Sequence, residues 1–425
     1  MINKKEFTIR RVYINANGLC RVYALGTEHV GDDGAQSDSP REFQGKMTAN
    51  KSTNQAFIID ADKGLQKLIA VLAAEGYQVV GPRLEDGAIV YAELASSADL
   101  PVGLKDEQDG GKYKLVKGRE GVYFDYVVGP HSWKRYLFPP DQKICEFRRQ
   151  GKAFRIVEET PEVPAYAFIG ARPCELQALQ IHDRVFDNGE FADPGYLARR
   201  AAAFVVAVNC TQAGGTCFCA SMNSGPKASG GFDLALTEIS EKSRHVFVVE
   251  VGSPRGQMIV AKLKGSAAED SDIAKADTLV KKAAAKMGRE MVDDVGPLLK
   301  RNLEHNRWYE VAKRCLSCAN CTMVCPTCFC NTVEDATDLT GSSAVRTRRW
   351  DSCFTMDFSY IHGGSIRREG ASRYRQWMTH KLSSWFDQFE QSGCVGCGRC
   401  ITWCPVGIDI TEEARAIRDS EGGAK

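Results

Sequence analysis

The pattern of apolar and polar positions predicts strands alternating with helices between residues 56 and 265. The short runs "YQVV", "AIVYAEL", "AYAFIGA", "AFVVAVN" and "HVFVVEV" are rich in valine, isoleucine and aromatic residues, as strands are. Apolar residues also recur at helical spacing after a capping aspartate, Asp60 or Asp62, up to Gly76. The helical face that they define consists of Leu65, Leu68, Ile69 and Leu72. This alternation is typical of an α/β-type domain, which we place at residues 56–265.

The pattern changes after residue 265. The segment "SDIAKADTLVKKAAAKMGREM" favours helix but carries little apolar surface, so we predict a helical connector at residues 266–300. Residues 301–425 alternate helix-like segments, "RYRQWMTHKLSSWFDQF" and "TEEARAIRD" among them, with cysteine motifs, and few strand signals occur there. Residues 1–55 are polar and weakly patterned, which predicts a poorly ordered leader or linker. The expected fold class is α+β multidomain, with the α/β-type domain followed by a mainly helical two-cluster ferredoxin domain.

Composition narrows the class of protein. A chain of 425 residues that is 43% hydrophobic and 26% charged is typical of a soluble globular protein with two or three domains. A formal net charge of +1 creates no overall field for nucleic acid or an acidic membrane. Runs such as "AAAFVVAV" are much shorter than the roughly 20 apolar residues that cross a bilayer, and the first residues match no export signal. We therefore predict a cytoplasmic protein with no nucleic-acid or membrane partner.

The cysteines need a chemical explanation. Seventeen of them in a chain predicted to lie in a reducing compartment indicate metal or redox chemistry, because disulfides are rare there. No G-x-G-x-x-G follows a predicted strand and no P-loop occurs, so we expect no NAD or flavin in this chain. The sequence also offers no catalytic residues and no spare C-x2-C pairs for a nickel-iron centre.

Two copies of the spacing C-x2-C-x2-C-x3-C, each followed by proline, are typical of proteins with two 4Fe-4S clusters. A tight loop points three thiolates at one cluster, and the fourth cysteine ligates the other cluster. We therefore assign Cys315, Cys318, Cys321 and Cys404 to the first cluster. The second cluster is assigned Cys394, Cys397, Cys400 and Cys325. The alternative is structural zinc, which usually takes two separated C-x2-C pairs.

The sequence "TCFC" at residues 327–330 also occurs at residues 216–219. The earlier copy lies near Cys210, and Cys174 follows a predicted strand, so loops at the same ends of neighbouring strands could converge. A third iron-sulfur cluster is the resulting hypothesis, with Cys174, Cys210, Cys217 and Cys219 as its ligands; packed free thiols are the alternative. We interpret Cys328, Cys330 and Cys353 as packed free thiols. No motif or spacing indicates a role for Cys20 or Cys145.

Basic residues exceed acidic ones between the two ferredoxin motifs, in residues 341–381. A solvated charged surface is the simplest interpretation. The excess could also offset the negative charge of thiolate-bound clusters, or dock an acidic partner.

Several segments together resemble the beta subunit of soluble, sulfhydrogenase-type nickel-iron hydrogenases, and the first subunit of anaerobic sulfite reductase is similar. The resemblance runs from about residue 56 to 420, and its segments are "GPHSWKRYLFPP", "GARPCELQALQIHDRVF", "VAVNCTQAGGTCFCASMNSGP", "RCLSCANCTMVCPTCFC", "WDSCFTMDFSYIHGG" and "GCVGCGRCITWCPVGIDIT". It implies an electron-transfer subunit of an oxidoreductase complex, between a flavin- and NAD(P)-binding subunit and the large and small hydrogenase subunits. Residues 1–55 have no counterpart in it.

Two alternatives to this function remain. The chain could be the equivalent electron-transfer subunit of a sulfite-reducing complex, which only its neighbouring subunits would distinguish. It could instead reduce sulfur or polysulfide with its TCFC cysteines, a chemistry that requires an exposed thiolate of low pKa.

Overall fold

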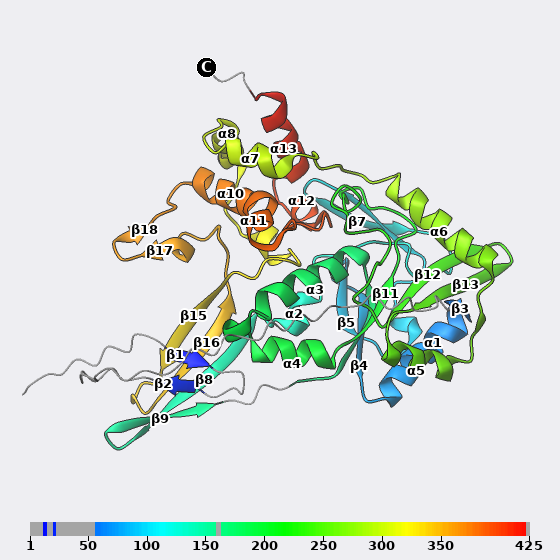
Figure 1. The fold of residues 1–425 in the computed structure, drawn as a ribbon, viewed down its shortest axis with the longest axis horizontal. Helices are drawn as coiled ribbons and strands as arrows, with labels where there is room; N and C mark the ends of the chain where they lie inside the picture. The colour runs from blue at the N-terminus through cyan, green and yellow to red at the C-terminus, as the bar shows by residue number, and fades with distance from the viewer. Residues whose placement is uncertain (1–11, 15–19, 23–55, 159–162, 422–425) are drawn as a thin grey trace, which may run out of the picture.

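The computed structural model describes residues 12–14, 20–22, 56–158 and 163–421. Its largest element is an eight-stranded sheet of order β14-β3-β13-β12-β11-β10-β4-β5 (Figure 1). The strands are β3 (Ala56–Asp60), β4 (Gln78–Glu85), β5 (Ala88–Glu93), β10 (Tyr166–Ala171), β11 (Phe204–Val208), β12 (Leu234–Glu241), β13 (Arg244–Val251) and β14 (Ser266–Ala267). The strands predicted from the apolar runs are confirmed. The sequence analysis did not predict strands β3, β12 and β14.

The centre of this sheet is parallel. Strand β10 pairs in parallel with β4 and with β11, and β11 pairs in parallel with β12, whereas the outer pairs are antiparallel. The parallel pairing of β10 with β11 confirms the neighbours expected from the helical crossover between them. Because parallel strands end at the same edge of a sheet, the loops after residues 171 and 208 emerge together.

Helices cover both faces of the sheet. On one face, α1 (Ala61–Ala74) and α5 (Pro254–Leu263) bury the predicted leucine and isoleucine side chains of α1. Asp60 is the N-cap, since its carboxylate accepts hydrogen bonds from the backbone of Asp62 and Lys63. The opposite face packs against α2 (Lys134–Leu137), α3 (Pro173–Phe186) and α4 (Pro194–Ala202). The predicted connector contains α6 (Asp270–Ala284).

The C-terminal part holds a second core, built on Trp308, Tyr374 and Trp377. Its helices are α7 (Val295–Arg301), α8 (Arg307–Arg314), α9 (Asn320–Met323), α10 (Gly370–Thr379), α11 (Trp385–Phe389), α12 (Arg399–Thr402) and α13 (Ile410–Asp419). A π-helical turn, His380–Ser384, joins α10 to α11. The helices predicted near residues 373–389 and 411–419 are confirmed. Each cysteine motif consists of a loop and a one-turn helix, because Cys321 lies in α9 and Cys400 in α12.

Strands also occur in this part, so the description "mainly helical" is not confirmed. Strands β15 (Asn331–Thr337) and β16 (Ser343–Trp350) join β8 (Asp141–Gln150) and β9 (Ala153–Glu158) in a sheet of order β15-β16-β8-β9, at the opposite end of the molecule from α1 and α5 (Figure 1). Short strands β17 (Tyr360–Ile361) and β18 (Gly364–Ser365) follow.

The basic residues of the segment between the motifs explain why its strands were missed. Arg346, Arg348 and Arg349 lie on β16, and each pairs with a carboxylate. The distances are 2.7 Å from Arg346 to Asp335, 2.5 Å from Arg348 to Asp193 and 2.8 Å from Arg349 to Asp141. The Arg346 and Arg349 pairs join neighbouring strands and stay partly exposed to solvent, whereas the Arg348 pair is more buried and joins β16 to Asp193, the N-cap residue of α4.

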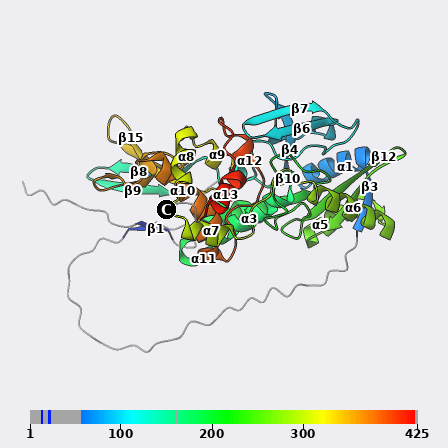
Figure 2. The same ribbon diagram turned by 90° about the horizontal axis from the view of Figure 1, so that it is seen from above.

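A further hairpin, β6 (Leu104–Asp109) and β7 (Lys112–Lys117), lies beside α12 in Figure 2, where the Gly111 N–H donates to the Ile401 carbonyl at 3.1 Å. The prediction of poor order for residues 1–55 falls mostly outside the described residues. Within that range, β1 (Val12–Ile14) and β2 (Cys20–Val22) pair antiparallel. None of the described helices is long and apolar enough to span a membrane. The domain limits remain predictions.

Candidate iron-sulfur sites

The two ferredoxin-type loops have matching backbones. Left-handed residues occupy equivalent positions, with φ values of 51° and 66° at Ser317 and Ala319 and of 60° and 77° at Gly396 and Gly398. In both loops an amide donates to the first cysteine sulfur at 3.4 Å, from Ser317 to Cys315 and from Gly396 to Cys394. A one-turn helix follows each loop, α9 in the first and α12 in the second. The repeated sequence spacing therefore produces a repeated local structure.

The first cavity is lined by Cys315, Cys318, Cys321 and Cys404, the four residues assigned to the first cluster. Its apolar walls include Tyr374 and Trp377 from the C-terminal core, and Cys400 also contributes. Cys318 is exposed and the neighbouring Leu316 is 62% exposed, so one edge of this cavity reaches the surface.

The second cavity is lined by Cys325, Cys394, Cys397 and Cys400, which are the residues assigned to the second cluster. The buried Lys381 also lines it, with its Nζ 3.3 Å from Cys325 Sγ and 2.7 Å from Thr327 Oγ1. Burial lowers the pKa of Lys381, but the surrounding sulfur atoms outweigh that effect and hold the pKa well above its ordinary value. The sequence offered two interpretations of the basic residues at 341–381 that bear on Lys381, a solvated surface and an offset to cluster charge; Lys381 fits the second, although no spacing signal marks it as a buried cation.

The third cavity is lined by Cys174, Cys210, Cys217 and Cys219. Cys174 lies in the first turn of α3, directly after β10, and Cys210 follows β11, so the parallel strands bring these loops together. Arg172 and Cys397 line the same cavity, although the sequence suggested neither. All four cysteines predicted to bind a third iron-sulfur cluster thus line one cavity, and their role as ligands remains a prediction.

The three cavities form a row. Trp377 and Cys400 line both the first and the second, and Cys397 lines both the second and the third. The loops that line the second and third cavities are in direct contact, because the Phe218 N–H donates to the Gly396 carbonyl at 2.8 Å. A Cβ on Gly398 would lie only 2.4 Å from the Thr216 carbonyl oxygen, so this approach requires glycine.

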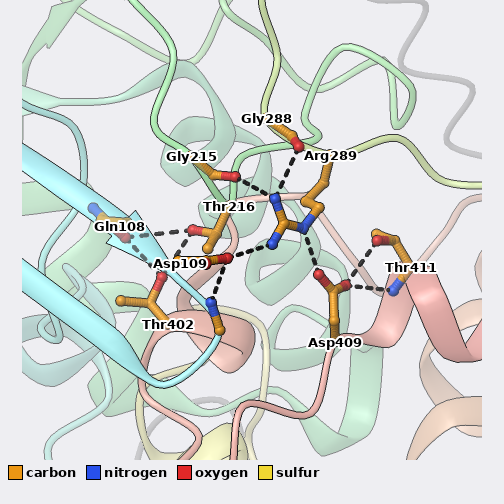
Figure 3. A network of polar contacts seen from close by, with 10 residues as sticks. Gln108, Asp109, Gly215, Thr216, Gly288, Arg289, Thr402, Asp409 and Thr411 are labelled. Carbon is orange, nitrogen blue, oxygen red and sulfur yellow. Dashed lines mark hydrogen bonds and ion pairs between the residues drawn. The ribbon is translucent and has the colours of Figure 1, made fainter.

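Figure 3 shows how the loop of the third cavity is fixed to the C-terminal part. Arg289 follows α6 and donates to Asp109 at 2.7 Å, to Asp409 at 2.5 Å and to the Gly215 carbonyl at 3.0 Å. Beside it, the hydroxyl groups of Thr216 and Thr402 lie 2.8 Å apart. Hairpin β6–β7, the cysteine loop, the connector and the start of α13 therefore share one polar network.

The donor chemistry of the cavities fits iron-sulfur clusters. Burial raises the pKa of Cys217 and of Cys394 to about 12, and it holds those of Cys174, Cys321 and Cys400 well above their ordinary values. Such thiols keep their protons near neutral pH unless a bound cationic centre displaces them. Among the described residues, no three His, Cys, Asp or Glu side chains are arranged to hold a single metal ion.

Comparison with known proteins defines the class. Residues 314–408 match the family model described as a 4Fe-4S dicluster domain, which gives the class of the C-terminal part of the chain. The chain is also similar to the Sulfhydrogenase 2 subunit beta of Pyrococcus furiosus, with 29% identity over 316 residues, which is 72% of this chain and 89% of that protein. It is therefore an iron-sulfur electron-transfer subunit related to that beta subunit, and the resemblance found in the sequence is confirmed.

The third site can be tested by iron content. In anaerobically reconstituted full-length protein, Cys210→Ala should lower iron and sulfide by about one third, because one of three clusters of about four iron atoms would be lost. Cys145→Ala is the matched control, since Cys145 is also buried but lies in β8 and lines none of the three cavities. Unchanged iron content in folded Cys210→Ala protein would leave the third set as packed thiols.

Proposed function

We propose that this chain relays electrons between a flavin- and NAD(P)-binding subunit and a nickel-iron hydrogenase module. The observation that supports the proposal is the row of three cysteine-lined cavities with shared walls. It leads from an exposed edge at Cys318 to the carboxyl end of the parallel strands. The similarity to a sulfhydrogenase beta subunit suggests the kind of complex in which such a path would work.

The proposed ligand sets follow the cavities. Two 4Fe-4S clusters would be held by Cys315, Cys318, Cys321 and Cys404, and by Cys325, Cys394, Cys397 and Cys400. A third iron-sulfur cluster would be held by Cys174, Cys210, Cys217 and Cys219. Bound clusters of this kind supply one-electron transfer at potentials that charge, hydrogen bonds and solvent exposure adjust.

The chain's own residues orient the sulfur ligands, exclude water and balance charge. Amides of the two loops donate to sulfur, and Trp377 and Phe218 are buried walls that keep water away. The Lys381 ammonium lies beside Cys325, and Arg172 lies 3.9 Å from Cys210 Sγ. Both cations offset thiolate charge, which favours the reduced state of the site beside them.

Dependence on a partner tests this function. The isolated, cluster-loaded chain should neither bind NAD(P)H nor be reduced by it, because no nucleotide-binding motif is present in the sequence. Addition of the flavin-binding subunit should allow NAD(P)H to bleach the cluster absorbance, measured anaerobically in a stopped-flow instrument. Tight flavin binding by the chain alone would contradict the proposal. Copurification with a siroheme protein would assign the chain to a sulfite-reducing complex.

A further inference from the structure

The hairpin formed by β17 and β18 exposes large apolar side chains to solvent. Figure 1 shows both strands at the outer edge of the molecule, beside α10. Within residues 356–366, side chains that are between 36% and 64% exposed belong to Met356, Phe358, Tyr360, Ile361 and Ile366. Because neighbouring residues of a strand face opposite sides, the exposure of both Tyr360 and Ile361 means that the described chain covers neither face of the hairpin. Such a concentration of exposed apolar side chains is typical of an interaction surface.

The hairpin is nevertheless an ordered element. Tyr360 pairs with Ser365 and Ile361 pairs with Gly364 in the antiparallel ladder. The Ser365 hydroxyl also donates to the Met356 carbonyl at 2.8 Å, which closes the base of the hairpin. A partner would therefore meet a surface whose shape is already fixed.

A buried arginine of α10 connects the hairpin to the first cavity. Arg373 Nη1 lies 3.7 Å from Met356 Sδ and donates to two backbone carbonyl groups just after the hairpin, at 2.9 and 2.7 Å. Its Nη2 donates to the Ser317 hydroxyl at 3.3 Å, in the first cysteine loop. Leu316 and Cys318, on either side of Ser317, are both exposed. We define the hairpin patch as Leu316, Met356, Phe358, Tyr360, Ile361 and Ile366.

Charges without an ionic partner lie at the edge of this patch. Arg367 donates to a glutamine side chain and Arg368 to a backbone carbonyl, both at 3.2 Å, and neither pairs with a carboxylate within the described ranges. The exposed Asp357 and Glu369 likewise pair with no cation of the described residues. The other basic residues of segment 341–381 contact carboxylates, carbonyl groups or the second cavity. An apolar centre with charges at its rim is the usual composition of a protein–protein interface.

The contacts to sulfur indicate which partner belongs at this end of the row. In the second and third cavities a cation contacts a cysteine sulfur, Lys381 at 3.3 Å and Arg172 at 3.9 Å. In the first cavity the described contacts to sulfur are neutral amides, from Ser317 at 3.4 Å and Ile408 at 3.3 Å. A cluster there would have the lowest potential of the three, and a covering protein would lower it further by excluding water from Cys318. At neutral pH the proton–hydrogen couple has a lower potential than the nicotinamide couple, so the hydrogen-oxidising partner fits this end.

We propose that the hairpin patch is the docking surface for the nickel-iron hydrogenase module. The identity of the partner rests on the proposed function. An apolar groove of the module would enclose both faces of the hairpin, and charges at the rim of that groove would pair with Arg367, Arg368, Asp357 and Glu369. The module would also cover Cys318. Each hydrogen molecule oxidised in the module releases two protons there, and its two electrons would pass one at a time to the first cluster.

Binding is measured by sedimentation velocity, with the full-length, cluster-loaded chain and the separately purified hydrogenase module as the probe. The double variant Ile361→Glu with Ile366→Glu should raise the dissociation constant at least about tenfold, because two carboxylates would be placed in the apolar centre of the interface. The matched control is Phe191→Glu with Met258→Glu, at exposed apolar residues before α4 and on α5. This control should bind the module as the wild type does. Neither double variant should alter binding of the flavin-binding subunit.

Electron transfer gives a second readout. With hydrogen and the module present, the cluster absorbance of the wild type should bleach, and the Ile361→Glu, Ile366→Glu protein should bleach more slowly until excess module is added. Its iron content and paramagnetic signals should equal those of the wild type, which separates docking from cluster binding.

Three results would overturn the docking surface. They are unchanged binding of the module by the Ile361→Glu, Ile366→Glu protein, loss of the flavin-binding subunit in place of the module, and a wild-type dimer of this chain that the double variant abolishes. If the module binds through the patch but hydrogen does not bleach the clusters, the relay function is wrong and the docking surface stands.

Discussion

Substitution of Cys325 by serine should disrupt the second cluster, although Cys325 belongs to the first cysteine motif in the sequence. Cys325 lines the second cavity with Cys394, Cys397 and Cys400, and it does not line the first. The change also removes the sulfur that Lys381 contacts at 3.3 Å, leaving a buried ammonium with one partner fewer. We expect a loss of about four iron atoms per chain and of one paramagnetic signal in the reduced protein.

Two matched variants make this result specific. Cys318→Ser, in the same sequence motif, should disrupt the first cluster and leave the second signal in place, because Cys318 lines only the first cavity. Cys404→Ser, in the other motif, should also disrupt the first cluster and leave the second signal in place. Crossed ligation is wrong if Cys325→Ser and Cys318→Ser alter the same signal in electron paramagnetic resonance.

Local sequence signals were sufficient for much of the fold and for the arrangement of the cavities. The apolar runs that became β10 and β11 are almost continuous, as buried parallel strands are, and the helix between them fixes a parallel crossover. The sequence alone therefore placed Cys174 and Cys210 at one edge of the sheet. The cysteine spacing likewise predicted which residues of the two motifs line each cavity.

Features that depend on contacts between distant segments could not be predicted in this way. Strand β16 pairs with β8, about two hundred residues earlier, and its arginines conceal the strand pattern because their carboxylate partners lie on other segments. Lys381 lies in a helical stretch where nothing local indicates a buried cation. Cys397 lines the third cavity only because the loop at residues 216–219 packs onto the second motif.

A buried ion pair between Arg399 and Glu175 connects the two halves of the molecule. Arg399 follows the second cysteine loop and Glu175 lies in the first turn of α3, and their side chains are 0% and 2% exposed at a distance of 2.5 Å. Arg399 also donates to the carbonyl groups of Gly129 and His131, both at 2.8 Å. The second oxygen of Glu175 accepts from the Tyr91 hydroxyl at 2.6 Å. These three partners of the guanidinium, Glu175, Gly129 and His131, lie in the sheet-containing part.

Arg399→Met should lower the free energy of unfolding by about 3–5 kcal/mol, because it leaves the Glu175 carboxylate buried without its cation. The measurement is the urea midpoint of anaerobic, cluster-loaded protein, followed by far-ultraviolet circular dichroism and by cluster absorbance. Arg349→Met, at an exposed pair with Asp141 whose side chains are 53% and 59% exposed, should cost less than about 1 kcal/mol. The double variant Arg399→Met with Glu175→Leu should regain part of the loss, since no unpaired charge remains. Equal midpoints for Arg399→Met and Arg349→Met would mean that this pair does not hold the second cysteine loop against the sheet.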